Sequence, residues 1–187
     1  MVILIRLGAF RFLRRNKIKL AWEAYWIAGA SAKPDPTQPK LFRAERKPLH
    51  LPEFRESKLE DAYNEKEYLG FPLSLSHFDM LQTRFRGAVH ADNLAAHHGQ
   101  VVRMLGELVT TKPTRTSGGK RMYFGTFLDY NGRFFDTVNF PPTLRHSPFT
   151  GDGVYLIKGK VSTDFGVPTL EVYRMQRLPM RPKPGQA

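Results

Sequence analysis

The residues best suited to chemistry lie between positions 112 and 135, where a basic segment precedes two aromatic-rich ones. Gly118 and Gly119 sit within the basic segment, and glycine lets a backbone lie close to a phosphate. An exposed aromatic ring stacks on a nucleic-acid base with about 1–3 kcal/mol. The combination predicts a surface for single-stranded nucleic acid. A later strand and the loop after it add Lys160 and Phe165, because the loop between the fourth and fifth strands flanks the same surface in barrels of the kind expected here. The candidate contact residues are Lys112, Arg115, Lys120, Arg121, Phe124, Phe134, Lys160 and Phe165.

Each aromatic residue also has a purely structural interpretation. Successive side chains of a strand point to opposite faces, so about half of these rings belong in a core. If Tyr123 and Phe127 share one face, Phe124 lies on the other, and the alternation alone leaves open which face is exposed. We take Phe124 as the first choice for an exposed stacking ring. The basic segment has its own alternative, a charged loop that is merely solvated.

A second motif lies in a proline-rich stretch. Gln38, Leu41 and Phe42 fall in an extended segment bounded by prolines. Such a peptide can insert two apolar side chains into a pocket of a partner while the glutamine makes directed hydrogen bonds. The alternative is that Leu41 and Phe42 pack on this protein's own surface.

No catalytic arrangement emerges from the sequence. There is no cysteine, and the six histidines lack the spacing of metal ligands. Phosphoryl transfer with two metal ions needs carboxylates that converge on both metals. Asp61 and Asp79 are isolated in the sequence, and Asp129 and Asp136 suit a turn and a strand. We therefore expect no catalytic residue, no metal and no cofactor.

The charge distribution favours a polyanionic partner. The net charge is +12, and residues 99–187 hold 13 Lys and Arg against 6 acids, a balance of +7. Residues 1–30 hold 6 against 1. Each contact between a cation and a phosphate releases condensed counterions, which favours binding. The apolar start is too short to span a membrane, so we expect a soluble, cytoplasmic protein without a membrane partner.

Five regions position these residues. Apolar spacing predicts helices in residues 1–30, broken at Gly8 and near Asn16. Residues 31–58 read as an extended linker and 59–98 as short helices, the first ending at Gly70. Residues 99–178 have strand character, and the tail from 179 to 187 is basic and flexible in expectation.

The strand region predicts a small barrel. Strands are expected at residues 101–109, 121–128, 134–140, 154–163 and 168–175, with Asn131-Gly132 as a tight turn. A short helical or irregular link at 143–149 separates the third and fourth strands. Five strands with this insertion are typical of the OB fold, a Greek-key barrel, although SH3-like barrels have similar periodicity. We therefore predict an α+β chain, with helices and a linker followed by a five-stranded OB-fold barrel.

Several segments, taken in order, resemble the C-terminal part of the bacterial DNA polymerase III alpha subunit, a family C polymerase. Leu-Ile-Arg-Leu-Gly-Ala-Phe at residues 4–10 is similar to the end of that family's helix-hairpin-helix region. Residues 67–79 are similar to its Leu-Gly-x-x-Leu-Ser segment, with His77 where many members have proline. Residues 110–116 and 122–129 are similar to its first two OB strands.

The resemblance implies a function for the whole chain. It implies that the barrel binds single-stranded template DNA, and that Gln38, Leu41 and Phe42 form the peptide that binds the sliding clamp. It also implies other replisome subunits and upstream polymerase domains as partners. The family's catalytic aspartates belong to a palm domain that no residue here matches, so we expect no polymerase activity from this chain alone. Two alternatives stay open: a nucleotidyltransferase in its own right, and an adaptor whose barrel binds a replisome protein.

Overall fold

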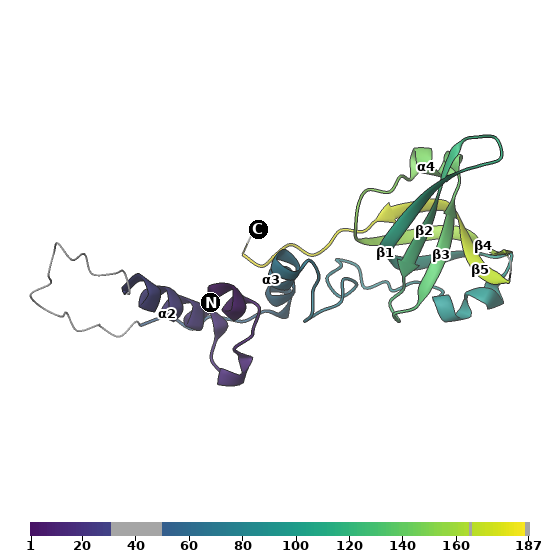
Figure 1. Ribbon diagram of the computed structural model, residues 1–187. Helices are drawn as coiled ribbons and strands as arrows, with labels where there is room; N and C mark the ends of the chain where they lie inside the picture. The colour runs from purple at the N-terminus through teal and green to yellow at the C-terminus, as the bar shows by residue number, and fades with distance from the viewer. Residues whose placement is uncertain (31–49, 165, 186–187) are drawn as a thin grey trace, which may run out of the picture. The chain divides into compact units, whose positions relative to one another are not determined.

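The computed structural model describes residues 1–30, 50–164 and 166–185. The chain divides into two compact units (Figure 1). The first, here the helical unit, contains Met1–Leu75 together with the segment that begins at Pro182. The second, Ser76–Arg181, contains the barrel. None of the helices in the described ranges is long and apolar enough to cross a membrane.

Short helices make up the first unit, and the predicted breaks between them are confirmed. Their bounds are α1 Val2–Arg6, the 3-10 helix η1 Arg11–Leu13, α2 Lys17–Ala30 and α3 Lys58–Leu69. Gly8 follows α1 with φ +76°, a conformation that favours glycine. The Asn16 Oδ1 accepts hydrogen bonds from the backbone N–H groups of Ile18 (3.0 Å) and Lys19 (3.2 Å), which caps α2. Gly70, with φ +87°, ends α3 as expected.

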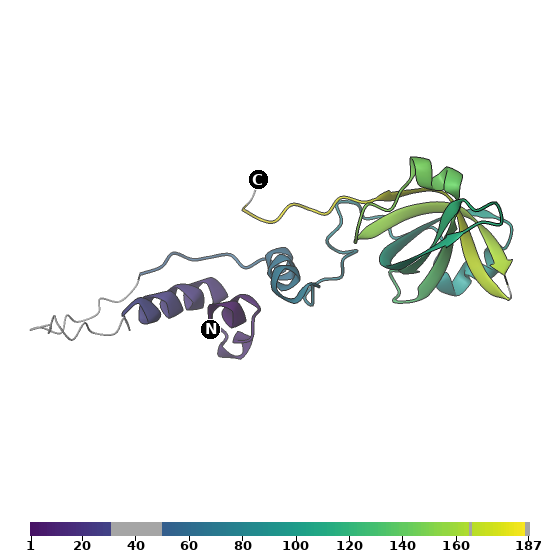
Figure 2. The same ribbon diagram turned by 45° about the horizontal axis from the view of Figure 1, so that its top comes forward.

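The second unit is a closed five-stranded barrel, which confirms the predicted fold class (Figure 2). Its elements are β1 Val101–Arg115, β2 Arg121–Leu128, β3 Phe134–Asn139, α4 Pro141–His146, β4 Val154–Asp164 and β5 Val167–Arg177. The strand order around the barrel is β1-β2-β3-β5-β4. All neighbours are antiparallel except β3 and β5, which are parallel. This order, with a helix between β3 and β4, is OB-like.

Aromatic side chains fill the barrel core. Phe127 is fully buried and Phe135 is 4% exposed, and their rings stack with centroids 5.6 Å apart. Tyr155 packs edge-on against Phe127 at 5.9 Å. Gly106 lets the rings come this close, because a Cβ there would lie 2.7 Å from the Phe135 ring. The alternate residues of β2 and β3 therefore point outward.

The barrel unit begins at Ser76, whereas the sequence placed the start of the barrel domain at residue 99. The 3-10 helix η2, Ala91–His97, contributes Leu94 to the core, and Phe78 packs with Leu105 and Val154 in a second cluster. Residues 179–181, expected as the start of a flexible tail, belong to the barrel unit. The Gln82 N–H donates to the Pro179 carbonyl (3.1 Å), which holds the chain just beyond β5 against the barrel unit.

Candidate nucleic-acid interface

The outer surface of β2 and β3 carries two exposed phenylalanines. Phe124 is 42% exposed and Phe134 is 65% exposed. Phe134 pairs with Leu128, which lies four residues from Phe124 and so points to the same side of the sheet. This settles which rings of β2 and β3 face solvent: Phe127 and Phe135 point into the core, and Phe124 and Phe134 point outward. Tyr123 is half-buried and packs against Phe149. We call the surface of Phe124, Thr126, Phe134 and Asp136 the β2–β3 face.

Polar groups separate the two rings. The Thr126 hydroxyl donates a hydrogen bond to the Asp136 carboxylate at 2.7 Å. Lys112 of β1 lies directly opposite Phe124 and is exposed. A strand of nucleic acid that stacks on both rings must therefore turn its phosphates away from Asp136 and toward the lysine.

The β1–β2 hairpin, residues 115–121, concentrates positive charge at one end of this face. Arg115 pairs directly with Arg121, and the turn between them is closed by the Gly119 N–H, which donates to the Thr116 carbonyl at 2.8 Å. Arg115, Lys120 and Arg121 are exposed. Within the described part of the chain, none of the three has an ion pair or a side-chain hydrogen bond. These cations are therefore available to phosphates.

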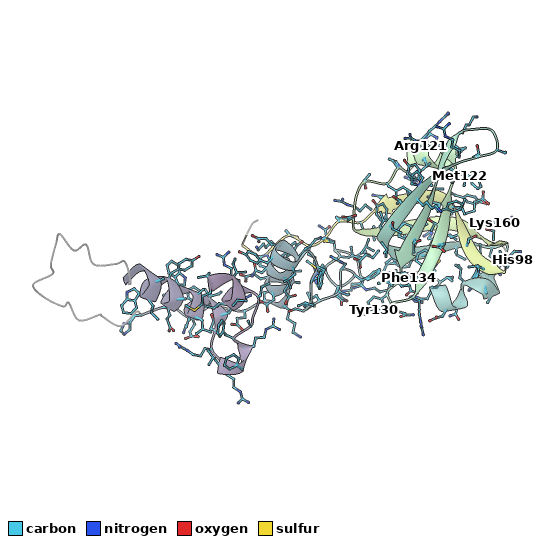
Figure 3. All side chains as sticks on the ribbon, in the orientation of Figure 1. His98, Arg121, Met122, Tyr130, Phe134 and Lys160 are labelled. Carbon is cyan, nitrogen blue, oxygen red and sulfur yellow. The ribbon has the colours of Figure 1, made fainter. Side chains whose placement is uncertain are left out.

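A groove of about 580 Å³ lies between this hairpin and α4. Its basic lining residues are Lys120, Arg121 and Arg145, and its aromatic ones are Tyr123 and Phe149. The two aromatic rings pack together with centroids 6.0 Å apart. Figure 3 shows Arg121 at this end of the barrel and Phe134 at the other end of the β2–β3 face. The groove thus continues the charged hairpin with an apolar wall.

Arg145 is the residue of this surface that sequence reasoning missed. It stands in the last turn of α4, which the sequence predicted only as a helical or irregular link. Nothing local to residues 141–146 indicates that this helix approaches the β1–β2 hairpin. The one sequence signal that could have indicated Arg145 as a contact residue was its positive charge within the insertion between the third and fourth strands.

Not all predicted contact residues come together. Lys160 lies on β4, between Val101 of β1 and Glu171 of β5, and not on the β2–β3 face. Phe165 lies outside the described residues. The predicted clamp-binding residues Gln38, Leu41 and Phe42 also fall outside them.

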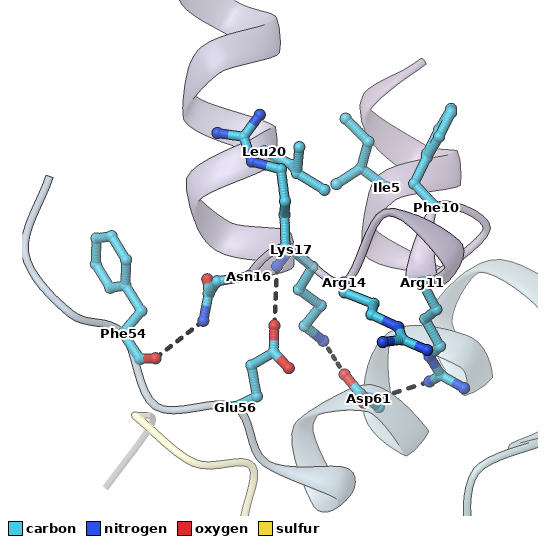
Figure 4. Close-up of a pocket in the computed structure, with 12 residues that line it drawn as sticks. Ile5, Phe10, Arg11, Arg14, Asn16, Lys17, Leu20, Phe54, Glu56 and Asp61 are labelled. Carbon is cyan, nitrogen blue, oxygen red and sulfur yellow. Dashed lines mark hydrogen bonds and ion pairs between the residues drawn. The ribbon is translucent and has the colours of Figure 1, made fainter.

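Carboxylates in the helical unit are engaged in ion pairs. Asp61 forms ion pairs with Lys17 and, at 3.4 Å, with Arg11 (Figure 4). The Lys17 backbone N–H donates to the Glu56 carboxylate at 2.8 Å. These contacts surround a pocket of about 450 Å³. They are the bonds expected of groups that hold short helices together.

Glu65 on α3 is the most buried of these acids, with its side chain 2% exposed. It accepts hydrogen bonds from the backbone N–H groups of Leu73 (2.6 Å) and Ser74 (2.7 Å) and from the Ser74 hydroxyl (2.6 Å). Burial raises the pKa of the Glu65 carboxyl, but these three bonds and the nearby Arg11 outweigh it and hold the pKa below its usual value. Glu65 thus fastens the loop after α3 as a carboxylate.

The described residues contain no group of three or more His, Asp or Glu side chains that could hold a metal ion. Asp129 shows how the acids of the barrel are used instead. It is 2% exposed and accepts hydrogen bonds from the backbone N–H groups of Ala91, Asn131 and Arg133, each at 2.9 Å. It therefore fixes the β2–β3 turn.

Comparisons with known proteins add little to this geometry. No protein-family model matches the sequence, and no curated protein matches it. Among solved structures, the chain is similar to a lipoprotein from Klebsiella pneumoniae that is named as a candidate nucleic-acid-binding protein. The identity is 18% and the TM-score 0.35, over 43% of this chain and 73% of the lipoprotein. Because both values are low, we draw no ligand or function from this neighbour.

Proposed function

We propose that the barrel binds single-stranded nucleic acid, with bases stacked on the β2–β3 face and phosphates held by the β1–β2 hairpin and the groove beside α4. The observation that carries this proposal is the joint exposure of Phe124 and Phe134 on one face, next to cations that have no partner among the described residues. Aromatic rings that are exposed in this way can stack on nucleic-acid bases.

The spacing of the two rings suits an extended strand. Four residues of β-strand separate Phe124 from Leu128, the partner of Phe134, and four residues span about 13 Å. Each stacked base contributes about 1–3 kcal/mol and tolerates any sequence, because every base has a π-face. Duplex DNA already stacks its bases on one another, so it cannot use these rings. The face therefore favours single strands over duplex.

The finer proposal is that this strand is template DNA in a replicative DNA polymerase. Its support is the order of sequence segments that resemble the C-terminal part of the DNA polymerase III alpha subunit, from residues 4–10 to 122–129. In this proposal Gln38, Leu41 and Phe42 tether the enzyme to the sliding clamp. A tether acts through effective concentration, so even a weak peptide keeps the enzyme near its primer terminus. Nucleotide transfer itself belongs to the upstream polymerase domains.

The adaptor alternative predicts exposed aliphatic residues on β2 and β3. The exposed large apolar side chains of these two strands are both phenylalanines, Phe124 and Phe134, which favours nucleic acid over a protein partner. The nucleotidyltransferase alternative requires convergent carboxylates, and the acid on this face, Asp136, is paired with a threonine hydroxyl.

One titration tests the proposal. Labelled single-stranded and duplex DNA are titrated with the intact chain at several salt concentrations. We expect tighter binding to the single strand and a log–log salt slope of about 0.7 per phosphate contact. Arg115→Ala with Lys120→Ala should lower that slope by about 1.4, two contacts' worth. The proposal fails if this chain binds single-stranded DNA no more tightly than an unrelated protein of equal charge does at about 0.15 M salt. Screening removes weak charge attraction at that salt concentration.

A further inference from the structure

Three positively charged residues stand side by side across three strands of the barrel. Arg103 of β1 lies opposite Lys158 of β4, and Lys158 lies opposite Arg174 of β5. All three are exposed. Neighbouring strands are about 4.8 Å apart, so the side chains leave the surface in one line about 10 Å long. We call Arg103, Lys158 and Arg174 the basic row.

The basic row lacks counter-charges in the part of the chain that the structure describes. None of its members has an ion pair or a side-chain hydrogen bond there. Other cations of the barrel unit do have such partners: Arg86 pairs with Asp79 and Arg133 with Asp92. Like charges directly opposite each other on a sheet are destabilising. The row therefore opposes folding, and an anion bound across it would remove that repulsion.

This row is on the other side of the barrel from the β2–β3 face. In the closed order β1-β2-β3-β5-β4, the strand β4 lies between β1 and β5, and both β2 and β3 lie beyond them. A strand of nucleic acid confined to Phe124 and Phe134 cannot also contact Lys158. The row thus needs either a second ligand or a ligand long enough to pass around the barrel.

The charge and arrangement of the basic row indicate which class of ligand it would bind. Peptides commonly bind sheets by adding a strand to a free edge, but Lys158, at the centre of the row, lies on β4, which pairs with β1 on one side and β5 on the other. What remains is a line of three cations that alternates arginine and lysine. A line of charges matches a linear polyanion, whose phosphates each release counterions on contact.

We infer that the basic row binds the phosphate backbone of a second stretch of nucleic acid. This inference rests on the proposed function and extends it: the β2–β3 face binds bases by stacking, and the basic row binds backbone by charge. The row does not depend on base identity or on strandedness. The contribution of the basic row to the binding constant should fall with salt, by about 0.7 log units per phosphate contact for each log unit of salt concentration with single strands.

The test compares two variants with equal loss of charge. Lys158→Gln with Arg174→Gln alters the basic row. Arg55→Gln with Lys58→Gln removes one arginine and one lysine from exposed positions of the helical unit. Both are titrated with two oligo-dT probes over a range of salt. The short probe has about 8 nucleotides, within the range that one OB barrel covers, and the long probe has several times that length.

We expect the row variant to bind the short probe as the parent does. With the long probe its salt slope should fall by about 1.4, while the control variant keeps the parent's slope. At low salt the row variant should melt no earlier than the parent, because like charges have been removed. An unchanged slope with the long probe, or a slope that falls equally in the control, overturns the inference alone.

Two further outcomes separate this inference from the proposed function. If the row variant loses the short probe as well, the row belongs to the first binding path and is not a second site. If the parent binds neither probe, the proposed function fails and the inference fails with it.

Discussion

Replacement of Phe124 with alanine tests the stacking surface most directly. Alanine removes the ring and leaves every charge in place. Loss of one stacked base costs about 1–3 kcal/mol, which weakens single-strand binding by roughly 5- to 150-fold. The salt slope should stay at the parent's value, because no phosphate contact is lost.

The structure also sets the cost of this change to stability. Truncation of a fully buried phenylalanine costs about 3–5 kcal/mol. Phe124 is 42% exposed, so we expect roughly half of that, about 2 kcal/mol. A domain is commonly stable by 5–15 kcal/mol, so the barrel should remain folded. Phe127→Ala, at a fully buried position, should destabilise it by the full amount.

Tyr173→Ala is the matched control. Tyr173 is 47% exposed, close to the value for Phe124, and it lies on β5, two strands away from β2 in the barrel. Its loss should cost similar stability without affecting stacking on the β2–β3 face. The assay is fluorescence anisotropy with oligo-dT of about 8 nucleotides, together with a thermal melt of each variant. Equal affinities of the Phe124 and Tyr173 variants, or a changed salt slope for Phe124→Ala, would refute the stacking model.

Three other outcomes are expected. The low pKa of Glu65 in the folded chain means that its stabilisation is present above the unfolded value of about 4.3 and is lost as pH falls through the folded pKa. Melting followed against pH should therefore show the helical unit weakening in acid, and Glu65→Gln should reduce that dependence; an equal dependence in the variant contradicts this role. The chain alone should extend no primer with magnesium or manganese, and template-dependent incorporation by a preparation free of host polymerase would overturn that expectation. Leu41→Ala with Phe42→Ala should abolish binding to a sliding clamp while DNA binding persists, and unchanged clamp affinity would remove the tether proposal.

Local sequence signals determined the secondary structure and the architecture built from it. Apolar runs, alternation and turn signals located the five strands, because these signals reflect each strand and turn by itself. The first strand was expected to end at residue 109, but β1 continues to Arg115, so Lys112 and Arg115 lie on the strand and not in the loop after it. The end of α3 at Gly70 and the Asn131-Gly132 turn could also be predicted from local sequence. The φ angle is +87° at Gly70 and +75° at Gly132, and residues other than glycine rarely adopt such positive values. The cap of α2 is local as well, because Asn16 bonds the backbone N–H groups of residues only two and three positions further on. Residues 76–98 were harder to assign, because their one regular element is the short 3-10 helix η2, and their apolar side chains pack against the barrel.

Only the tertiary structure decided which side of each strand faces solvent. The alternation in β2 is equally compatible with Phe124 inside or outside, and the choice follows from the packing of Phe127 with Phe135 and Tyr155, residues of two other strands. The alignment of Arg103 with Lys158 and Arg174 depends likewise on pairing between strands far apart in the sequence. Arg145 lines the same groove as Lys120 and Arg121 because of where the tertiary structure places α4. Register is a property of all the strands together, so a slip of one residue would place the side chains of the slipped strand on the opposite face.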